Sequence, residues 1–120
     1  MADALYQYRD NEFSITVYDT DGTTVIPAST YLNAQYRVFP IDSCTPVVSK
    51  SLSSGITVVN KTLPSGDVIE IFAIDIEDTE MTFSGTNGEY KHVFVVGEEA
   101  DEVLPSIFDE LVDVIPGCLI

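Results

Sequence analysis

Apolar and polar residues alternate along most of this chain with the period of a β-strand. Six short segments carry this alternation or a run of β-branched residues, namely residues 13–18, 32–39, 47–50, 56–59, 68–74 and 90–96. Turn-forming residues such as Gly22, Pro40 and Pro64 lie between them. The spacing, close to one turn every ten residues, predicts an all-β chain folded as an antiparallel β-sandwich.

The segment 106–115 has a different pattern. Residues 106–109 have the form of a capping box, and a set of apolar residues clusters on one face at helical spacing: Ile107, Phe108, Leu111, Val112 and Ile115. The periodicity alone favours a short helix, although residues 112–115 are rich in β-branched residues. A single helical turn is also predicted within the acidic segment 75–83, near residues 77–81.

Length and cysteine content restrict the type of sandwich. The chain has 120 residues, which is typical of one domain. It contains no tryptophan, and Cys44 and Cys118 flank predicted strands instead of facing each other within them. These features exclude an antibody-type domain with its buried tryptophan and inter-sheet disulfide, and they fit an Ig-like sandwich without the disulfide. Because the N-terminus carries no export signal, we expect both thiols to be reduced.

Charge narrows the choice of partners. Five basic residues and twenty acidic ones give a net charge of −15, of which −12 falls on residues 61–120. Without a cluster of Lys and Arg, the chain is not expected to bind nucleic acid or an anionic membrane. Its longest apolar run is too short to span a bilayer. The charge favours solubility and a basic partner.

No residue set typical of catalysis is present. The one histidine, His92, shares a predicted strand face with Tyr90 and Phe94, which favours a structural role in the core. A GxSxG motif, a phosphate-binding glycine loop and a cysteine with a basic neighbour are all missing. The sequence therefore predicts a protein that is not an enzyme and that has no catalytic or cofactor-binding residues.

Three acidic segments of the sequence contain oxygen ligands of the kind that bind calcium. Asp19, Asp21 and Gly22 match the start of a calcium loop, but Ile26 and Tyr31 lie where further ligands are needed. The acidic segments 75–80 and 98–102 offer oxygen ligands at unspecific spacing. Solvated loop acids are the preferred interpretation, so no metal site is predicted. The glycosylation sequon at residues 60–62 is taken as accidental.

Apolar residues also occur at both ends of the chain. They are Leu5, Tyr6, Tyr8, Leu119 and Ile120. Two interpretations stay open: these residues dock on their own sandwich, or they contact a neighbouring subunit, where aromatic anchors are favoured. We name them as candidate partner-contact residues.

The order of several short motifs resembles the Ig-like domains of structural proteins of tailed bacteriophages. The similarity is carried by residues 9–17, 21–22, 33–38, 50–51, 55–58, 78–79 and 88–92. It implies that Val112 and Val114 belong to a last strand, and for this reason we assign residues 106–115 to a strand. The resemblance covers residues 9–116, which leaves residues 1–8 as an N-terminal arm and 117–120 as a C-terminal tail.

The resemblance also implies a role. Such proteins are tail, baseplate or neck components, so we expect a non-enzymatic adaptor that docks neighbouring virion subunits or fibres through sheet edges and apolar termini. It would be present in repeated copies in a virion assembled in the host cytoplasm. The alternatives are a capsid decoration protein and a Ca²⁺-dependent carbohydrate-binding module, for which an aromatic platform would draw on Tyr6, Tyr8, Tyr18 and Tyr31.

Overall fold

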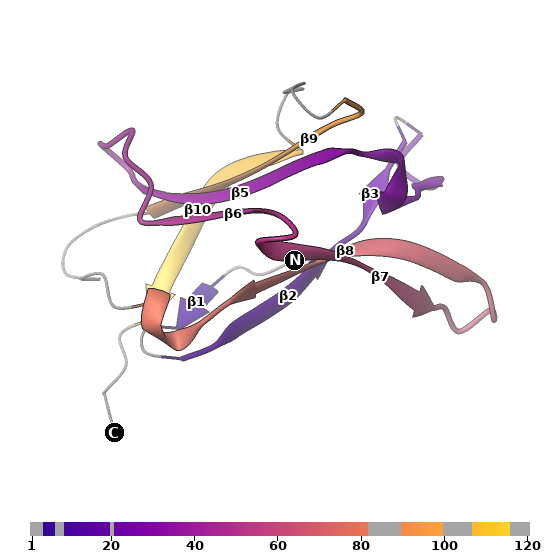
Figure 1. Cartoon of the computed structure of the whole chain (residues 1–120), viewed down its shortest axis with the longest axis horizontal. Coiled ribbons are helices and arrows are strands. Elements are labelled where there is room, and N and C mark those ends of the chain that lie inside the picture. The colour runs from indigo at the N-terminus through magenta and orange to yellow at the C-terminus, as the bar shows by residue number, and fades with distance from the viewer. Residues whose placement is uncertain (1–3, 7–8, 20, 82–89, 100–106, 116–120) are drawn as a thin grey trace.

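A computed structural model describes residues 4–6, 9–19, 21–81, 90–99 and 107–115 (Figure 1). Ten strands and two 3₁₀ turns account for its regular structure. The strands are β1 (Ala4–Tyr6), β2 (Asn11–Ile15), β3 (Val17–Tyr18), β4 (Val25–Ile26), β5 (Asn33–Pro40), β6 (Val48–Leu52), β7 (Gly55–Thr62), β8 (Val68–Ile76), β9 (Tyr90–Gly97) and β10 (Phe108–Ile115). The turns are η1 (Ala28–Thr30) and η2 (Asp78–Glu80). The predicted all-β class is confirmed.

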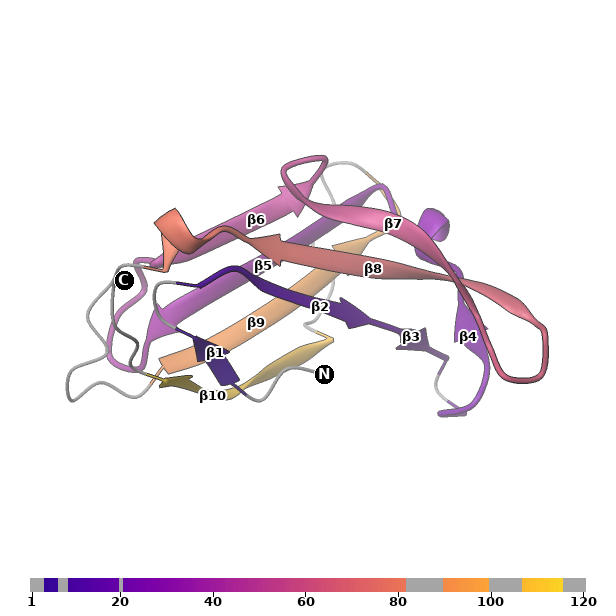
Figure 2. The ribbon, with the colours of Figure 1, turned by 90° about the horizontal axis from the view of Figure 1, so that it is seen from below.

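One sheet, in the order β1-β10-β9-β5-β6-β7-β8-β2, curls until its two halves face each other (Figure 2). One layer holds β10, β9, β5 and β6, and the other holds β7, β8 and β2. The chain passes between the layers at a tight corner, where Ser53 and Gly55 have φ of 67° and 95°. This strand order is that of an Ig-like sandwich, with β3 and β4 forming a small separate hairpin.

The core lies between the two layers, and alternate residues of β2, β5 and β9 are buried in it. The rings of Phe72 and Phe94 meet across it, edge to face, with centroids 5.3 Å apart. Tyr36 packs against Phe13 at 5.3 Å in the same manner. The largest fully buried side chains are Tyr36, Phe72, Phe94, Leu5, Ile56, Ile74, Ile76, Met81, His92, Val38 and Val96.

The strand assignment of the C-terminal segment is correct, and its helical periodicity is misleading. β10 pairs with β9 from Phe108 to Val112 and, in parallel, with β1. Along it, Leu111 is 61% exposed whereas Val112 is 3% exposed, which is the alternation of a strand. Hydrogen-bonding partners on both sides therefore outweigh the local pattern.

Three local features refine the sequence-based picture. The predicted strand 13–18 is divided at Thr16 into β2 and β3, and neither β1 nor β4 was anticipated. β1 lies within the segment 1–8 that was assigned to an arm. The helical turn expected in the segment 75–83 is η2, closed by a capping box between Glu77 and Glu80.

A single buried amide joins the two ends of the curled sheet. Asn11, at the start of β2, accepts a hydrogen bond from the Tyr6 N–H through Oδ1 (2.8 Å). Its Nδ2 donates to the carbonyl oxygens of Tyr6 (3.0 Å) and Arg9 (2.9 Å). The side chain thus supplies, between β1 and β2, the donor and acceptor that a neighbouring strand would supply.

Candidate functional site

The far half of the β7–β8 hairpin extends beyond the sandwich as a two-stranded ribbon (Figure 2). β7 pairs with β8 along its length from Ile56 to Thr62, but β2 pairs with β8 only from Phe72 onward. We call residues 58–62 and 68–71, with the turn between them, the ribbon. In that turn the Leu63 N–H donates to the Asp67 carbonyl at 2.8 Å.

The outer edge of β7 is open. Only Gly55 and Ile56 pair with β6, and from Thr57 to Thr62 no described strand pairs with this edge. Its unpaired backbone donors and acceptors form a template for an added strand. Proteins usually protect such edges with proline, lysine or a bulge, whereas this edge carries one lysine, Lys61, and no proline.

Apolar side chains on both faces of the ribbon are exposed to solvent. Val58 and Val59 are each 39% exposed, and Val68 is 62% exposed. Since adjacent residues of a strand point to opposite faces, Val58 and Val59 present one apolar side chain on each side. The ribbon therefore combines an open edge with apolar surface, as strand-addition sites do.

The base of the ribbon is held in place. The Glu70 carboxylate on β8 accepts a hydrogen bond from the Ser29 N–H at the η1 turn (3.1 Å). Ala28 in the same turn is buried, and Ile71 is only 4% exposed. These contacts fix the direction in which the ribbon leaves the sandwich.

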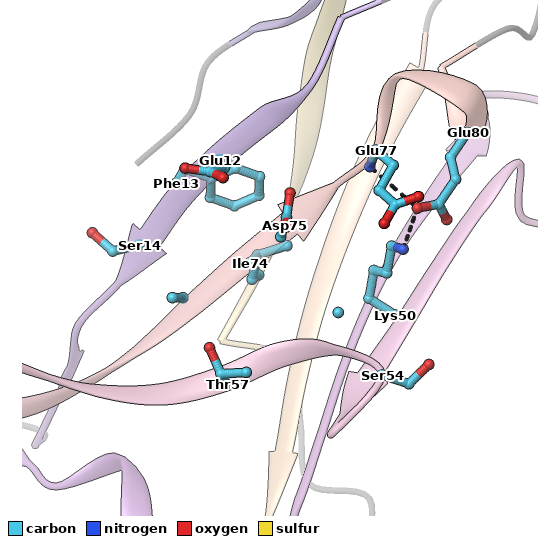
Figure 3. A pocket seen from close by; sticks show the side chains of 12 residues that line it. Glu12, Phe13, Ser14, Lys50, Ser54, Thr57, Ile74, Asp75, Glu77 and Glu80 are labelled. Atoms are coloured by element: carbon cyan, nitrogen blue, oxygen red, sulfur yellow. Dashed lines mark hydrogen bonds and ion pairs between the residues drawn. The ribbon is translucent and has the colours of Figure 1, made fainter.

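A groove of about 850 Å³ lies on the outer surface of β2 and β8, beside the start of β7 (Figure 3). An ion pair between Lys50 and Glu80 stands at one end, next to Glu77. Gly55 has φ of 95°, which favours glycine, and a Cβ atom there would lie 2.3 Å from Cδ of Lys50 and displace the lysine stem. The whole lining is Glu12, Phe13, Ser14, Lys50, Ser54, Gly55, Thr57, Ala73, Ile74, Asp75, Glu77 and Glu80.

The buried histidine belongs to the core, as the sequence predicted. His92 is 0% exposed, and its Nδ1 lies 3.0 Å from the hydroxyl oxygen of Tyr36. Its Nε2 lies 3.5 Å from Oε1 of Glu110 on the neighbouring strand β10. Burial raises the pKa of Tyr36 far above its ordinary value.

The candidate partner-contact residues at the ends of the chain differ in their burial. Leu5 is 0% exposed and packs in the chain's own core, which was one of the two interpretations, whereas Tyr6 is 47% exposed. Tyr8, Leu119 and Ile120 lie outside the described residues, as does Cys118, while Cys44 is exposed with a free thiol.

The tyrosines of the predicted carbohydrate platform also differ in their burial. Tyr31 is buried against Phe72, with ring centroids 6.2 Å apart, whereas Tyr18 is 53% exposed. Burial is also the main cause that raises the pKa of Tyr31, followed by the charges of Glu98 and Asp19. Of the four tyrosines, only Tyr6 and Tyr18 are exposed within the described residues.

In the turn that resembles a calcium loop, the carboxylate of Asp21 accepts hydrogen bonds from the backbone of the same turn. Oδ1 of Asp21 accepts hydrogen bonds from the backbone N–H groups of Thr23 and Thr24, both at 2.9 Å. The Thr24 hydroxyl donates to Oδ2, and this bond, followed by the backbone bonds from Thr24 and Thr23, lowers the pKa of Asp21 to about 2. Within the described part of the chain, no three His, Cys, Asp or Glu side chains gather in a way that could hold a metal ion.

The ribbon was not found by sequence reasoning, although the sequence holds a signal for it. In the segment 56–62, Val58 and Val59 are adjacent and polar residues follow, so the strand has no single apolar face. The pattern of these residues therefore does not specify which face of the strand is covered, in keeping with a strand that is only partly covered.

None of the described segments forms a helix with the length and apolar character that a membrane crossing requires. Comparison of the chain with protein-family models, with curated proteins and with solved structures found no match.

Proposed function

We propose that this chain is a non-enzymatic structural subunit of a tailed-bacteriophage virion, an adaptor of the tail or neck that captures a strand of a neighbouring subunit. The Ig-like strand order agrees with the resemblance seen in the sequence. The observation that carries the docking role is the open β7 edge from Thr57 to Thr62 on a ribbon that projects from the sandwich.

The chemistry of the edge defines its occupant. An added strand forms main-chain hydrogen bonds along β7, and its side chains contact Val58 on one face and Val59 on the other. With a net charge of −15, the chain attracts a basic segment and repels an acidic one. The partner is therefore an extended, net-basic segment of another virion protein.

Particle analysis tests this function. Particles of the phage whose genome encodes the chain, purified on a density gradient, are expected to contain it by mass spectrometry. The double variant Val58→Lys/Val59→Lys places charges on both sides of the edge. Once circular dichroism and urea unfolding of the purified variant show that it is folded, it is expected to be missing from the particles. The matched control Lys61→Arg on the same strand is expected to be incorporated.

Two results would overturn the proposal: a gene that lies outside any phage genome, or particles that incorporate the double variant at the normal level. Negative-stain images of particles lacking the chain distinguish an adaptor from a decoration protein. Missing tails or fibres indicate the adaptor, and intact but fragile heads indicate decoration.

A further inference from the structure

The open edge of β7 presents its backbone groups at alternate residues. The Ile56 carbonyl accepts a hydrogen bond from the Ser53 N–H at 2.9 Å, so it points away from β8. Because the backbone groups of an antiparallel strand alternate in direction, Val58, Asn60 and Thr62 also direct their N–H and C=O groups to the open edge. A strand added to β7 therefore forms its main-chain hydrogen bonds with these three residues.

The side chains between these residues form a row of differing chemistry on the outer face of β7. Thr57, Val59 and Lys61 share this face, and we call them the outer row. Thr57 lines the groove (Figure 3), and Val59 is 39% exposed. Lys61 lines a smaller hollow beside β2 and β3. Along the open edge the outer row thus passes from the groove, through an apolar residue, to a cation.

The groove end of the outer row is negatively charged. Lys50, the one cation of the groove lining, forms an ion pair with Glu80. Glu12 and Asp75 are both exposed and lie directly opposite each other in the register of β2 and β8. Like charges in this arrangement are destabilising, so a cation placed beside them is favoured.

Asp75 lies within reach of a strand added to β7. Thr57 pairs with Ala73, and Asp75 is two residues farther along β8 on the same face. Strand spacings of about 4.8 Å and a two-residue step of about 6.6 Å place its Cα about 12 Å from that of an added residue opposite Thr57. A lysine or arginine at that position spans this distance together with the aspartate side chain, passing over the small side chain of Ala73.

The other end of the outer row is positively charged. Lys61 is exposed and forms no ion pair within the described residues. Opposite charges on directly opposed residues of neighbouring strands attract each other, and like charges repel. A carboxylate opposite Lys61 in the added strand is therefore favoured, and a cation there is disfavoured.

We propose that the outer row selects the captured segment by its order of charges. The segment runs antiparallel to β7, the more stable of the two directions, with an acidic residue opposite Lys61, an apolar residue opposite Val59 and a basic residue opposite Thr57. The captured motif is therefore acidic-x-apolar-x-basic in chain order, within a segment that is net basic as a whole. This inference rests on the proposed capture of a strand and adds the sequence that the edge selects.

Two capped peptides of identical composition test the charge order by NMR titration of the full chain. The first contains Glu-Thr-Val-Thr-Lys and the second Lys-Thr-Val-Thr-Glu, each between the same lysine flanks. The first is expected to bind at least about tenfold more tightly, because it places opposite charges at both ends of the outer row. Bound at the edge, it is expected to slow hydrogen exchange at the N–H groups of Val58, Asn60 and Thr62, and to leave the alternate amides that bond to β8 unchanged.

A charge exchange within the chain is expected to reverse the preference. Asp75→Lys/Lys61→Glu keeps the net charge at −15 and is expected to bind the second peptide more tightly than the first. Asp42→Lys/Lys91→Glu is the matched control. It makes the same exchange in the turn after β5 and on β9, outside the groove and the outer row, and is expected to keep the preference of the wild type. Circular dichroism establishes that both variants are folded, and the comparison of the two peptides on the wild type needs neither of them.

Three results on the wild type overturn the inference: equal binding of the two peptides, tighter binding of the second, or no binding of either at about 2 mM. An unchanged preference in the folded variant Asp75→Lys/Lys61→Glu overturns it as well. The proposed function fails separately. A chain that is incorporated into phage particles but does not distinguish the peptides loses only the charge order, and a chain that prefers the first peptide but is absent from particles loses only the virion role.

Discussion

The two halves of β8 behave as different structures although they belong to one strand. From Phe72 to Ile74 the strand pairs with β7 on one side and β2 on the other, and Phe72, Ile74 and Ile76 have their side chains in the core. From Val68 to Ile71 it is paired only with β7, and Val68 is 62% exposed. Residues 72–76 hold the sandwich together, whereas residues 68–71 belong to the ribbon that carries the open edge.

This difference shows that regular pairing and burial are separate properties. The backbone register of β7 and β8 continues without interruption from the core into the ribbon. Apolar residues continue as well, but apart from the buried Ile71 the ribbon exposes several of them, among them Val58, Val59 and Val68. The exposed valines, together with the open edge of β7, are the physical basis of the docking role proposed above.

The largest expected effect comes from the buried half of β8. Phe72→Ala removes a fully buried ring that contacts Phe94 and Tyr31, and we expect it to lower the free energy of unfolding by about 3–5 kcal/mol. Val68→Ala on the ribbon is the matched control and is expected to change it by less than about 0.5 kcal/mol. Urea unfolding followed by circular dichroism measures both, and equal losses would contradict the distinction between the two halves.

The closure between β1 and β2 is expected to have the next largest effect. Asn11→Ala leaves the N–H and C=O groups of Tyr6 without their partner, and we expect a loss of about 1–3 kcal/mol in urea unfolding. Asn60→Ala, an exposed amide on the ribbon, is the control and is expected to have almost no effect. Equal stability of Asn11→Ala and the wild type would mean that the curled sheet closes without this amide.

Sequence pattern predicted the sandwich because most strands lie between a core and solvent. Period-2 alternation in residues 32–39 and 90–96 matches β5 and β9 within one residue at each end. It failed for β10, where Leu111 and Val112 are both apolar but lie on opposite faces. The residue types of β10 do not indicate which of its faces is covered, and we assigned this segment to a strand only because of the family resemblance.

The candidate site was less predictable for a related reason. Leu5 and Tyr6 are adjacent and were grouped as possible contact residues, yet Leu5 is buried in the core and Tyr6 is half exposed. The partners of β7 and the facing of Glu12 toward Asp75 depend on strand order, which local sequence does not contain. Open edges and charged faces are properties of the assembled sheet.

A smaller effect is expected from the buried Tyr36 at alkaline pH. Burial raises its pKa, so the folded state keeps the phenol protonated while the unfolded chain ionises near pH 10. Stability is then complete below pH 10 and is lost above it, by at most about 1.4 kcal/mol per pH unit for one group. Tyr36→Phe is expected to remove this part of the loss between pH 9 and pH 11 in urea unfolding, and an unchanged pH profile would contradict the assignment.

The smallest effect is expected at Asp21, in the exposed turn between β3 and β4. In this hairpin the turn provides partners for its own backbone donors, because the Asp21 carboxylate accepts hydrogen bonds from the N–H groups of Thr23 and Thr24. The bond from the Thr24 hydroxyl, followed by these two backbone bonds, lowers the pKa of Asp21 to about 2, so its contribution to stability is present above pH 3.8 and is lost as the pH falls through 2. Asp21→Asn is expected to flatten that acid limb slightly in unfolding experiments between pH 5 and pH 2. A difference of the same size at neutral and acid pH would show that the turn depends on the shape of the side chain and not on its charge.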